Sequence, residues 1–207
     1  MPPLLDAVPT RYLPLDDYIA DYNTISGSLD GDIWKSERAQ SFREPGNPSW
    51  EAFVAGRWDD AVASAAESLP ELIDYFAGLV GQGSRFYRVR AVEFPLTAYL
   101  HWELCVLRVR AQAGERIRIA LPRVTASAES LHGTIPELVI LGHAAGYVVD
   151  YGADGTPRGA EKFVDADAIS RCRAVLQKIY DESADFEQFF ASEVEPLGEP
   201  VRDPGPQ

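Results

Sequence analysis

Residues 85–110 constrain the fold of this chain more than any other segment, because they place positive charge inside its most apolar stretch. The run reads RFYRVRAVEFPLTAYLHWELCVLRVR. Its arginines are Arg85, Arg88, Arg90, Arg108 and Arg110. Burying an unpaired charge costs several kcal/mol or more, so a fold that buries this run has to supply carboxylates beside the arginines. The same cations mark a candidate centre of function without identifying that function.

Composition and charge exclude several classes of protein. The chain has 207 residues, 46% of them hydrophobic and 25% charged, with a formal net charge of -13. These values are typical of a soluble globular domain. Phosphate backbones would be repelled by so acidic a protein, so we expect no direct binding of nucleic acid. No apolar run approaches the roughly 20 residues that cross a bilayer, and the N-terminus lacks signal-peptide features. We predict a cytoplasmic protein that does not bind membranes.

The cysteine pattern argues against a structural metal site. Only Cys105 and Cys172 occur, each within an apolar helical pattern and without a CxxC motif or a histidine at metal-ligand spacing. We predict two buried free thiols, with a disulfide between them as the alternative. The sequence indicates no metal and no cofactor.

The N-terminal half reads as helical. Asn47-Pro48 has the pattern of an N-cap followed by proline at the first helical position. An apolar stripe then continues to Leu69, and Gly56 is expected to split it into two short helices. Pro70 begins the next predicted helix, which ends at Gly81.

The second half alternates between strand and helix patterns. Strands are predicted at 86–93, 116–121, 137–141 and 147–151, with a buried helix over 97–110 between the first two. Asp165 or Asp167 begins a long C-terminal helix whose apolar stripe runs to Phe190. The order helices, β-α-β-β-β, helix predicts an α/β (or α+β) fold. Its mixed central sheet is expected to start parallel and to gain antiparallel strands.

The domain organisation follows from these patterns. Residues 1–32 are predicted to be an extended N-terminal arm with one short helix around Asp16–Tyr22. Residues 33–195 are predicted to form a single α/β domain with a helical N-terminal half, and residues 196–207 a Pro-rich tail.

The candidate site centres on the strand that begins at residue 86. Alternation puts Arg88 and Arg90 on one face, and Glu103 lies on a packed face of the following helix. One interpretation is a site for phosphate or carboxylate, with Glu103 as a general acid or base. The other is structural pairing of the arginines with Glu93, Glu103 or Glu115. We predict that Glu103 pairs with Arg88 or Arg90. The candidate ligand- or partner-binding residues are Arg88, Arg90, Trp102, Glu103 and Tyr147.

Known catalytic motifs are missing from the sequence. It contains no GxGxxG, GxxxxGK[ST], GxSxG or HExxH motif. Residues two apart on a helix diverge by about 200°, so His101, Glu103 and Cys105 do not converge on one substrate. We predict no catalytic residues.

Several ordered motifs resemble those of a family of uncharacterised actinobacterial proteins. They are SWEAFVAGRW, RVRAV, PLTAYLHWEL and the late turn YGADG, and the resemblance covers about residues 33–190. Members of that family often accompany helix-turn-helix regulators, which implies a partner or regulatory role. The strand-helix-strand-strand pattern is also similar to half of a phospholipase D-like domain. The HxK motif of that superfamily is absent, since none of the three histidines is followed two residues later by lysine.

Two functions remain open. The first is a non-catalytic binding or regulatory protein that acts with a protein partner, possibly a helix-turn-helix regulator. The alternative is an enzyme or small-molecule sensor with an arginine-lined anion pocket. A filled arginine–carboxylate network would favour the first, and a deep pocket lined by the candidate residues would favour the second. Association into a homo-oligomer is compatible with either.

Overall fold

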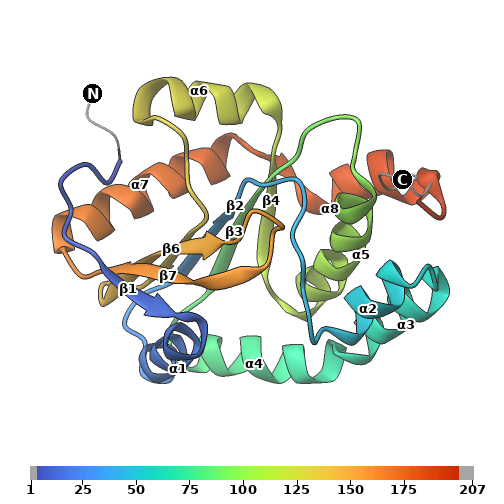
Figure 1. Cartoon of the computed structure of the whole chain (residues 1–207), viewed down its shortest axis with the longest axis horizontal. Helices are drawn as coiled ribbons and strands as arrows, with labels where there is room; N and C mark the ends of the chain where they lie inside the picture. Colours follow the sequence, from blue (N-terminus) through green and yellow to red (C-terminus); the bar gives the residue numbers. More distant parts are fainter. Residues whose placement is uncertain (1–3, 201–207) are drawn as a thin grey trace.

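One eight-stranded mixed sheet organises residues 4–200, the part of the chain that the computed structural model describes (Figure 1). The strands are β1 (Arg11–Pro14), β2 (Ile33–Glu37), β3 (Phe86–Ala91), β4 (Arg116–Ala120), β5 (Leu138–Leu141), β6 (Ala145–Tyr151), β7 (Pro157–Phe163) and β8 (Ala184–Asp185). Their order is β1-β7-β6-β5-β2-β3-β4-β8. Strands β2, β3 and β4 are parallel, and every other neighbouring pair is antiparallel. The predicted mixed α/β fold is confirmed.

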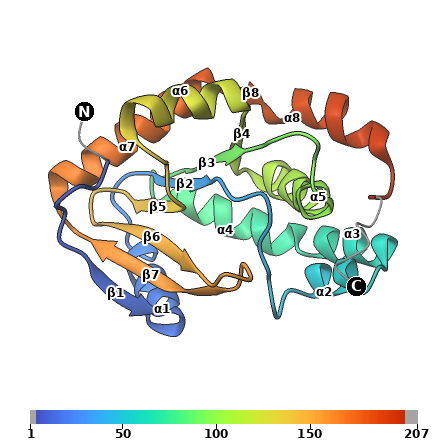
Figure 2. The same cartoon turned by 45° about the horizontal axis from the view of Figure 1, so that its top comes forward.

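Helices cover both faces of this sheet (Figure 2). They are α1 (Leu15–Ser26), α2 (Pro48–Val54), α3 (Trp58–Glu67), α4 (Leu69–Gly81), α5 (Ala98–Ala113), α6 (Pro122–His132), α7 (Ala166–Glu182) and α8 (Phe186–Phe189). Helices α6 and α7 pack on one face, while α1, α4 and α5 lie on the other (Figures 1 and 2). None of the helices in residues 4–200 combines the length and the apolar character needed to span a bilayer.

Strand alternation separates two layers of core. Trp34 and Val89 face α7 and belong to the same core cluster as Leu176. Ile33 and Phe86 face the opposite way, towards α4. Alternate side chains of β2 and β3 point to opposite layers, so the face that carries Ile33 and Phe86 also carries the charged residues of these strands. Those charged residues form the site described below.

Local helix signals account for the helical N-terminal part. The Asn47 side chain accepts hydrogen bonds from the N–H groups of Ser49 and Trp50, at 3.0 and 3.4 Å. Gly56 has φ +74°, a conformation that ends α2 and lets α3 begin two residues later.

The cap of the long C-terminal helix α7 is Asp165 and not Asp167, because the Asp165 carboxylate accepts a hydrogen bond from the N–H of Ala168 at 2.8 Å.

The structure corrects several sequence-based boundaries. Strands β2 (IWKSE) and β7 (PRGAEKF) were not predicted, because both are rich in charged residues. Helix α6 was not predicted either. The long C-terminal helix was predicted to run to Phe190. It ends instead at Glu182, where Ser183 turns extended and Asp185 caps the separate helix α8.

The N-terminal segment is part of the sheet. The short helix predicted around Asp16–Tyr22 is present and longer, as the twelve-residue helix α1, but the segment before it forms edge strand β1 instead of a free extended arm. Strand β1 pairs antiparallel with β7, and α1 packs on the same layer as α4. The predicted Pro-rich tail, residues 196–207, falls largely outside the described residues, because positions 201–207 are not described. Residues 1–3 are not described either.

Candidate functional site: a buried arginine–carboxylate network

Strand register builds the site. In the parallel pair β2 and β3, Lys35 lies beside Arg88 and Glu37 lies beside Arg90. Alternation points these four side chains to the face that α5 covers. Two cations on one strand therefore meet a cation and a carboxylate on the next, and α5 and its following turn supply further charge.

Arg88 is held between two carboxylates. Its Nε donates to Glu115 Oε1 at 2.5 Å, and its Nη1 donates to Glu37 Oε2. Arg110 of α5 donates from Nε to the other oxygen of Glu115. The Glu115 side chain is 0% exposed. This carboxylate is thus the centre of the network, with a guanidinium on each oxygen.

The guanidinium groups keep two of these carboxylates ionised. Burial opposes ionisation of Glu115, but Arg88 and Arg110 outweigh burial and hold its pKa below the usual value. Burial likewise opposes ionisation of Glu37, and Arg88, Lys35 and Arg90 together lower its pKa. Lys35 Nζ lies 2.6 Å from Glu37 Oε1.

The predicted pairing of Glu103 is confirmed, and its partner is Arg90. Both Nε and Nη2 of Arg90 lie 2.7 Å from Glu103 Oε2, and the arginine side chain is 0% exposed. Arg90 Nη1 also donates to the backbone carbonyls of Glu37 and Ala91, at 3.2 and 3.0 Å. The remaining strand arginine, Arg88, pairs with Glu115 and Glu37 instead.

The Glu103 carboxyl differs electrostatically from the other two. Burial raises its pKa to about 7; Arg90 lowers it, while the negative charge of Glu37 raises it further. A pKa raised above the unfolded value of about 4.3 gives stability that is fully present below that value and lost as pH rises through 7.

We therefore expect wild type to lose stability relative to a Glu103→Gln variant between pH 5 and pH 8, by at least about 1 kcal/mol. Glutamine has the same shape and does not titrate, so the difference reports this carboxyl. Urea unfolding at both pH values measures it. A difference that stays constant, or that grows in favour of wild type as pH rises, would contradict the raised pKa.

The other predicted site residues are divided by the structure. Trp102 lies beside the network; its Nε1 donates to Ser49 Oγ at 2.9 Å, which ties α5 to α2. Tyr147 lies elsewhere, on β6, and its hydroxyl donates to Asp21 of α1 at 2.6 Å. The structure thus brings Arg88, Arg90, Trp102 and Glu103 together and separates Tyr147 from them.

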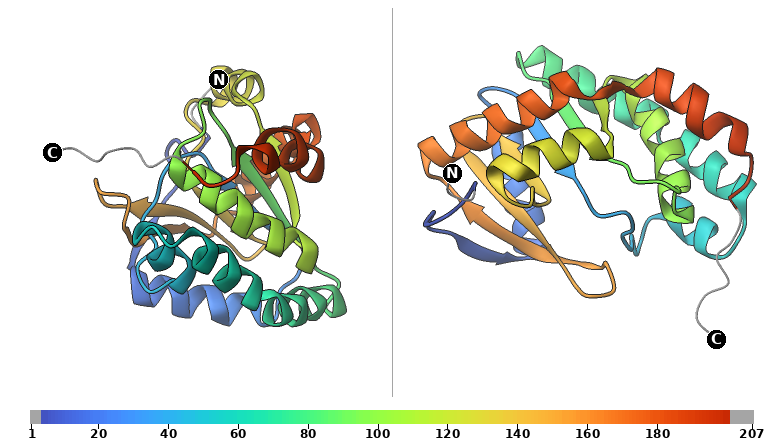
Figure 3. Two further views of the ribbon diagram at one scale, coloured as in Figure 1. Left: turned by 90° about the vertical axis from the view of Figure 1, so that its right-hand side faces the viewer. Right: turned by 90° about the horizontal axis from the view of Figure 1, so that it is seen from above.

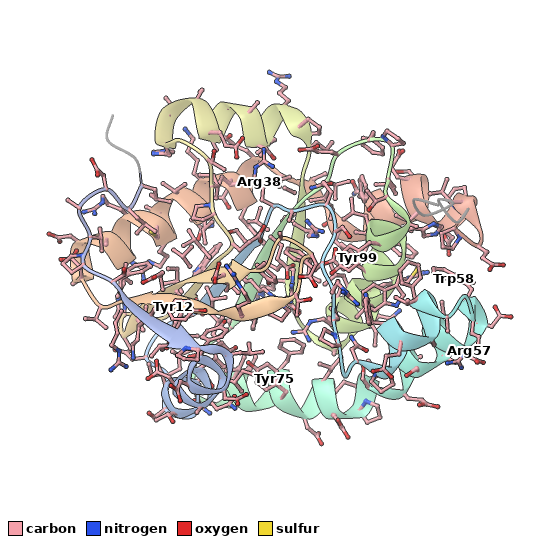
Figure 4. The ribbon with its side chains drawn as sticks, viewed as in Figure 1. Tyr12, Arg38, Arg57, Trp58, Tyr75 and Tyr99 are labelled. Atoms are coloured by element: carbon pink, nitrogen blue, oxygen red, sulfur yellow. The ribbon has the colours of Figure 1, made fainter. Side chains whose placement is uncertain are left out.

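Two cavities adjoin the network and share Lys35, Arg88 and Arg110 in their walls. The first, which we call the polar chamber, has a volume of about 370 Å³ and lies between α5, the loop 38–47 and the β6–β7 turn. Tyr99, labelled in Figure 4, donates to Glu44 at 2.7 Å across this chamber. The second, the aromatic chamber, has a volume of about 430 Å³ and lies between α1, α4 and the sheet.

The histidine and cysteine side chains of the described residues lie apart from the network and from one another's reach as metal ligands. Within residues 4–200, no group of three or more His, Cys, Asp and Glu side chains is placed to hold a metal ion. His101 is buried against the ring of Trp58, with centroids 5.2 Å apart. Cys105 and Cys172 are free thiols, as predicted, but only Cys172 is buried and Cys105 is half-buried. Burial raises the pKa of each to about 11, which keeps both protonated at neutral pH.

Sequence comparison places this site within a known domain. Residues 20–191 match the model of DUF6879, a domain of unknown function. The chain belongs to the DUF6879 family. The match begins inside α1 and ends just after α8, so the DUF6879 domain contains the whole network. The sequence resemblance to an uncharacterised family is confirmed at that level.

Other comparisons add little about the DUF6879 domain. No curated protein sequence matches it significantly. Among solved structures, the archaeal chromatin protein TrmBL2, which shows a novel mode of DNA binding, is similar over 85% of this chain and 52% of its own. The TM-score is 0.42 and the sequence identity 6%, so this likeness does not bear on function.

Proposed function

We propose that this DUF6879 chain is a non-catalytic binding or regulatory protein that acts with a protein partner. The observation that carries the proposal is an acidic helical surface with apolar residues exposed on it. The network supports it as well, because its arginines are already paired with carboxylates of the same chain. The sequence also lacks the HxK motif that a phospholipase D-like activity requires.

The acidic helical face is formed by α1, α3 and α4, which line one side of the molecule (Figure 3). Its exposed carboxylates are Asp16, Asp17, Asp59, Asp60, Glu67, Glu71 and Asp74. Arg57 is the only basic residue between positions 48 and 84, and it already pairs with Asp60 at 2.7 Å. Ile19 and Ile73 are exposed on the same helices. Exposed apolar side chains ringed by charge are typical of protein-binding surfaces.

The chemistry of this face selects a basic partner. A concentrated negative field steers a positively charged surface into encounter and repels nucleic acid. A helix-turn-helix regulator presents such a basic surface to DNA. The sequence resemblance to actinobacterial proteins that accompany these regulators makes one of them the first partner to test. A second acidic segment, Asp181–Glu187, lies on the opposite side of the sheet at the end of α7.

The proposal is tested by titration calorimetry of the purified chain with the helix-turn-helix regulator whose gene lies nearest to its own. We expect binding that weakens from 0.1 M to 1 M salt, because the screening length falls from about 10 Å to about 3 Å. Absence of heat and of co-elution at micromolar concentrations would refute this partner. Binding that tightens with salt would keep the partner and refute the electrostatic basis.

A second function, the sensing of a small molecule, is favoured by one specific observation. The two chambers have volumes of about 370 and 430 Å³, within the range of about 300–1,000 Å³ found for ligand sites. Arginines line both. The aromatic chamber lies between α1 and α4 and is lined by Ile19, so in this proposal the ligand binds next to the acidic helical face.

A further inference from the structure

We propose that the aromatic chamber binds a small amphipathic organic acid, with its carboxylate against Lys35 and Arg110 and its apolar body between α1 and α4. The inference rests on the sensor function proposed above and names its ligand class. It is argued from the lining of the chamber, from the hydrogen-bond donors left free in it and from the charge around it.

The lining of the aromatic chamber is apolar apart from its cations. Its aromatic side chains are Tyr18, Tyr22, Tyr75 and Phe86. The charged groups that line it are Lys35, Arg88 and Arg110, and no carboxylate of the described residues is among them. The polar chamber differs, because Glu37, Glu44 and Glu103 line it too. Charge complementarity therefore assigns an anion with an apolar body to the aromatic chamber.

Two of the three cations retain donors for such an anion. An ammonium has three N–H donors, and Lys35 directs one towards Glu37 at 2.6 Å. Arg110 donates from Nε to Glu115, while its two Nη groups have no acceptor within residues 4–200. The side chains of Lys35 and Arg110 are 26% and 23% exposed. Arg88, at 6%, is engaged by two carboxylates and acts as a positioning residue beneath them.

The walls of the chamber suit an aromatic or aliphatic body. The hydroxyl groups of Tyr22 and Tyr75 lie 3.1 Å apart and join α1 to α4; Figure 4 labels Tyr75 at this junction. The ring of Tyr18 packs on Tyr147 with centroids 5.1 Å apart. The Tyr18 hydroxyl has no hydrogen-bond partner among the described side chains, which leaves it free to contact a ligand.

The surrounding charge favours a carboxylate over a phosphate. Glu37 and Glu115 stay ionised directly behind Lys35 and Arg110, because their pKa values are lowered. These two carboxylates cancel part of the positive charge that faces the chamber. A group carrying one negative charge is therefore matched, whereas a phosphate monoester with nearly two would be left with one charge unneutralised.

Matched probes test this assignment by calorimetry and by saturation-transfer NMR. The probes are 1-naphthylacetate, its neutral amide 1-naphthylacetamide, 1-naphthyl phosphate and the cation 1-naphthylmethylamine. We expect the carboxylate to bind at least about 10-fold more tightly than the amide and the phosphate, and the amine not to bind. A 10-fold preference corresponds to about 1.4 kcal/mol. Equal binding of carboxylate and amide, or no binding of any probe up to millimolar concentrations, would overturn the proposal.

Three variants locate the site. Lys35→Met removes the charge and keeps the aliphatic stem. It should therefore lower the affinity for naphthylacetate at least about 10-fold without changing the affinity for the amide. Leu72→Trp fills the α4 wall and should abolish binding of both. Lys178→Met, the same change at an exposed position on α7, should leave binding unchanged. Thermal melting confirms that each variant is folded, and if Lys35→Met does not fold, Leu72→Trp and the amide comparison still decide.

The partner titration separates this inference from the rest of the account. If no probe binds but the regulator does, the ligand assignment and the sensor function are wrong and the protein-partner function stands. If naphthylacetate binds to wild type but not to Leu72→Trp, and no regulator binds, the ligand assignment stands and the protein-partner function is wrong. Unchanged binding of naphthylacetate in both Lys35→Met and Leu72→Trp would move the ligand out of the aromatic chamber and refute the proposal.

Discussion

An Arg88→Leu variant should lose about 3–5 kcal/mol or more of its free energy of unfolding. Arg88 contacts both Glu37 and Glu115, and all three are buried. Its removal leaves two ionised carboxylates facing an apolar side chain, with Lys35, Arg90 and Arg110 left to compensate. A domain of this size has a total stability of about 5–15 kcal/mol, so the variant should unfold at much lower urea concentration than wild type.

Arg158→Leu is the matched control. Arg158 also pairs with a carboxylate, Asp150, at 3.0 Å, but its side chain is 59% exposed. Exposed ion pairs contribute less than about 1 kcal/mol. Failure of Arg88→Leu to fold agrees with the account. Equal urea midpoints for the two variants would show that the network around Arg88 does not stabilise the fold.

The second large effect is expected for Glu103→Ala, at about 3–5 kcal/mol. The change leaves the guanidinium of Arg90 fully buried, with only backbone carbonyls as acceptors. It also opens a void between α5 and β3. Glu103→Gln should cost less, because the amide oxygen still accepts from Arg90 and part of the carboxyl population is protonated near pH 7.

Glu182→Ala is the control for this change. Glu182 pairs with Lys178 one helical turn away at 3.9 Å, and both side chains are exposed. It should change the free energy of unfolding by less than about 1 kcal/mol. A Glu103→Ala variant that melts within about a degree of wild type would contradict the buried pair. So would a cost for Glu182→Ala as large as that for Glu103→Ala.

The pairing of Glu103 could be predicted because it is local in sequence. Thirteen residues separate Arg90 from Glu103, and a strand followed directly by a helix brings them together. The sequence left Glu93, Glu103 and Glu115 open as partners for the two strand arginines. Packing in three dimensions selects Glu103 for Arg90 and Glu115 for Arg88.

The other half of the network could not be found this way. Glu37 lies 51 residues before Arg88, on a strand that places Lys35 and Glu37 after Ile33 on one covered face. A strand that points charges inwards has no apolar alternation, so sequence patterns do not reveal it. Strand β7 (PRGAEKF) also lacks a regular apolar alternation, so the sequence pattern did not predict it either. Strands with apolar cores, such as β3 and β5, and helices with clear caps, such as α2, were predicted correctly.

Tyr147 shows a further limit of sequence reasoning. It was among the candidate site residues, but α1 lies against β6 and the Tyr147 hydroxyl donates to Asp21 of that helix. That contact depends on the N-terminal segment joining the domain, which the expectation of an extended arm did not include. Once α1 is in place, the same segment completes both the aromatic chamber and the acidic helical face.

The rate at which a regulator associates with charge-matched variants tests the central proposal most directly. One variant, Asp59→Asn/Glu71→Gln/Asp74→Asn, removes three negative charges from the acidic helical face. Its control, Asp181→Asn/Glu182→Gln/Glu187→Gln, removes three negative charges from the end of α7 and from α8. The two variants have the same net charge.

Association with a helix-turn-helix regulator is measured by stopped flow at low salt. We expect the variant of the acidic helical face to associate at least about 10-fold more slowly than wild type. The control should stay within about 2-fold of wild type. Equal rates for the two variants would contradict binding through the acidic helical face.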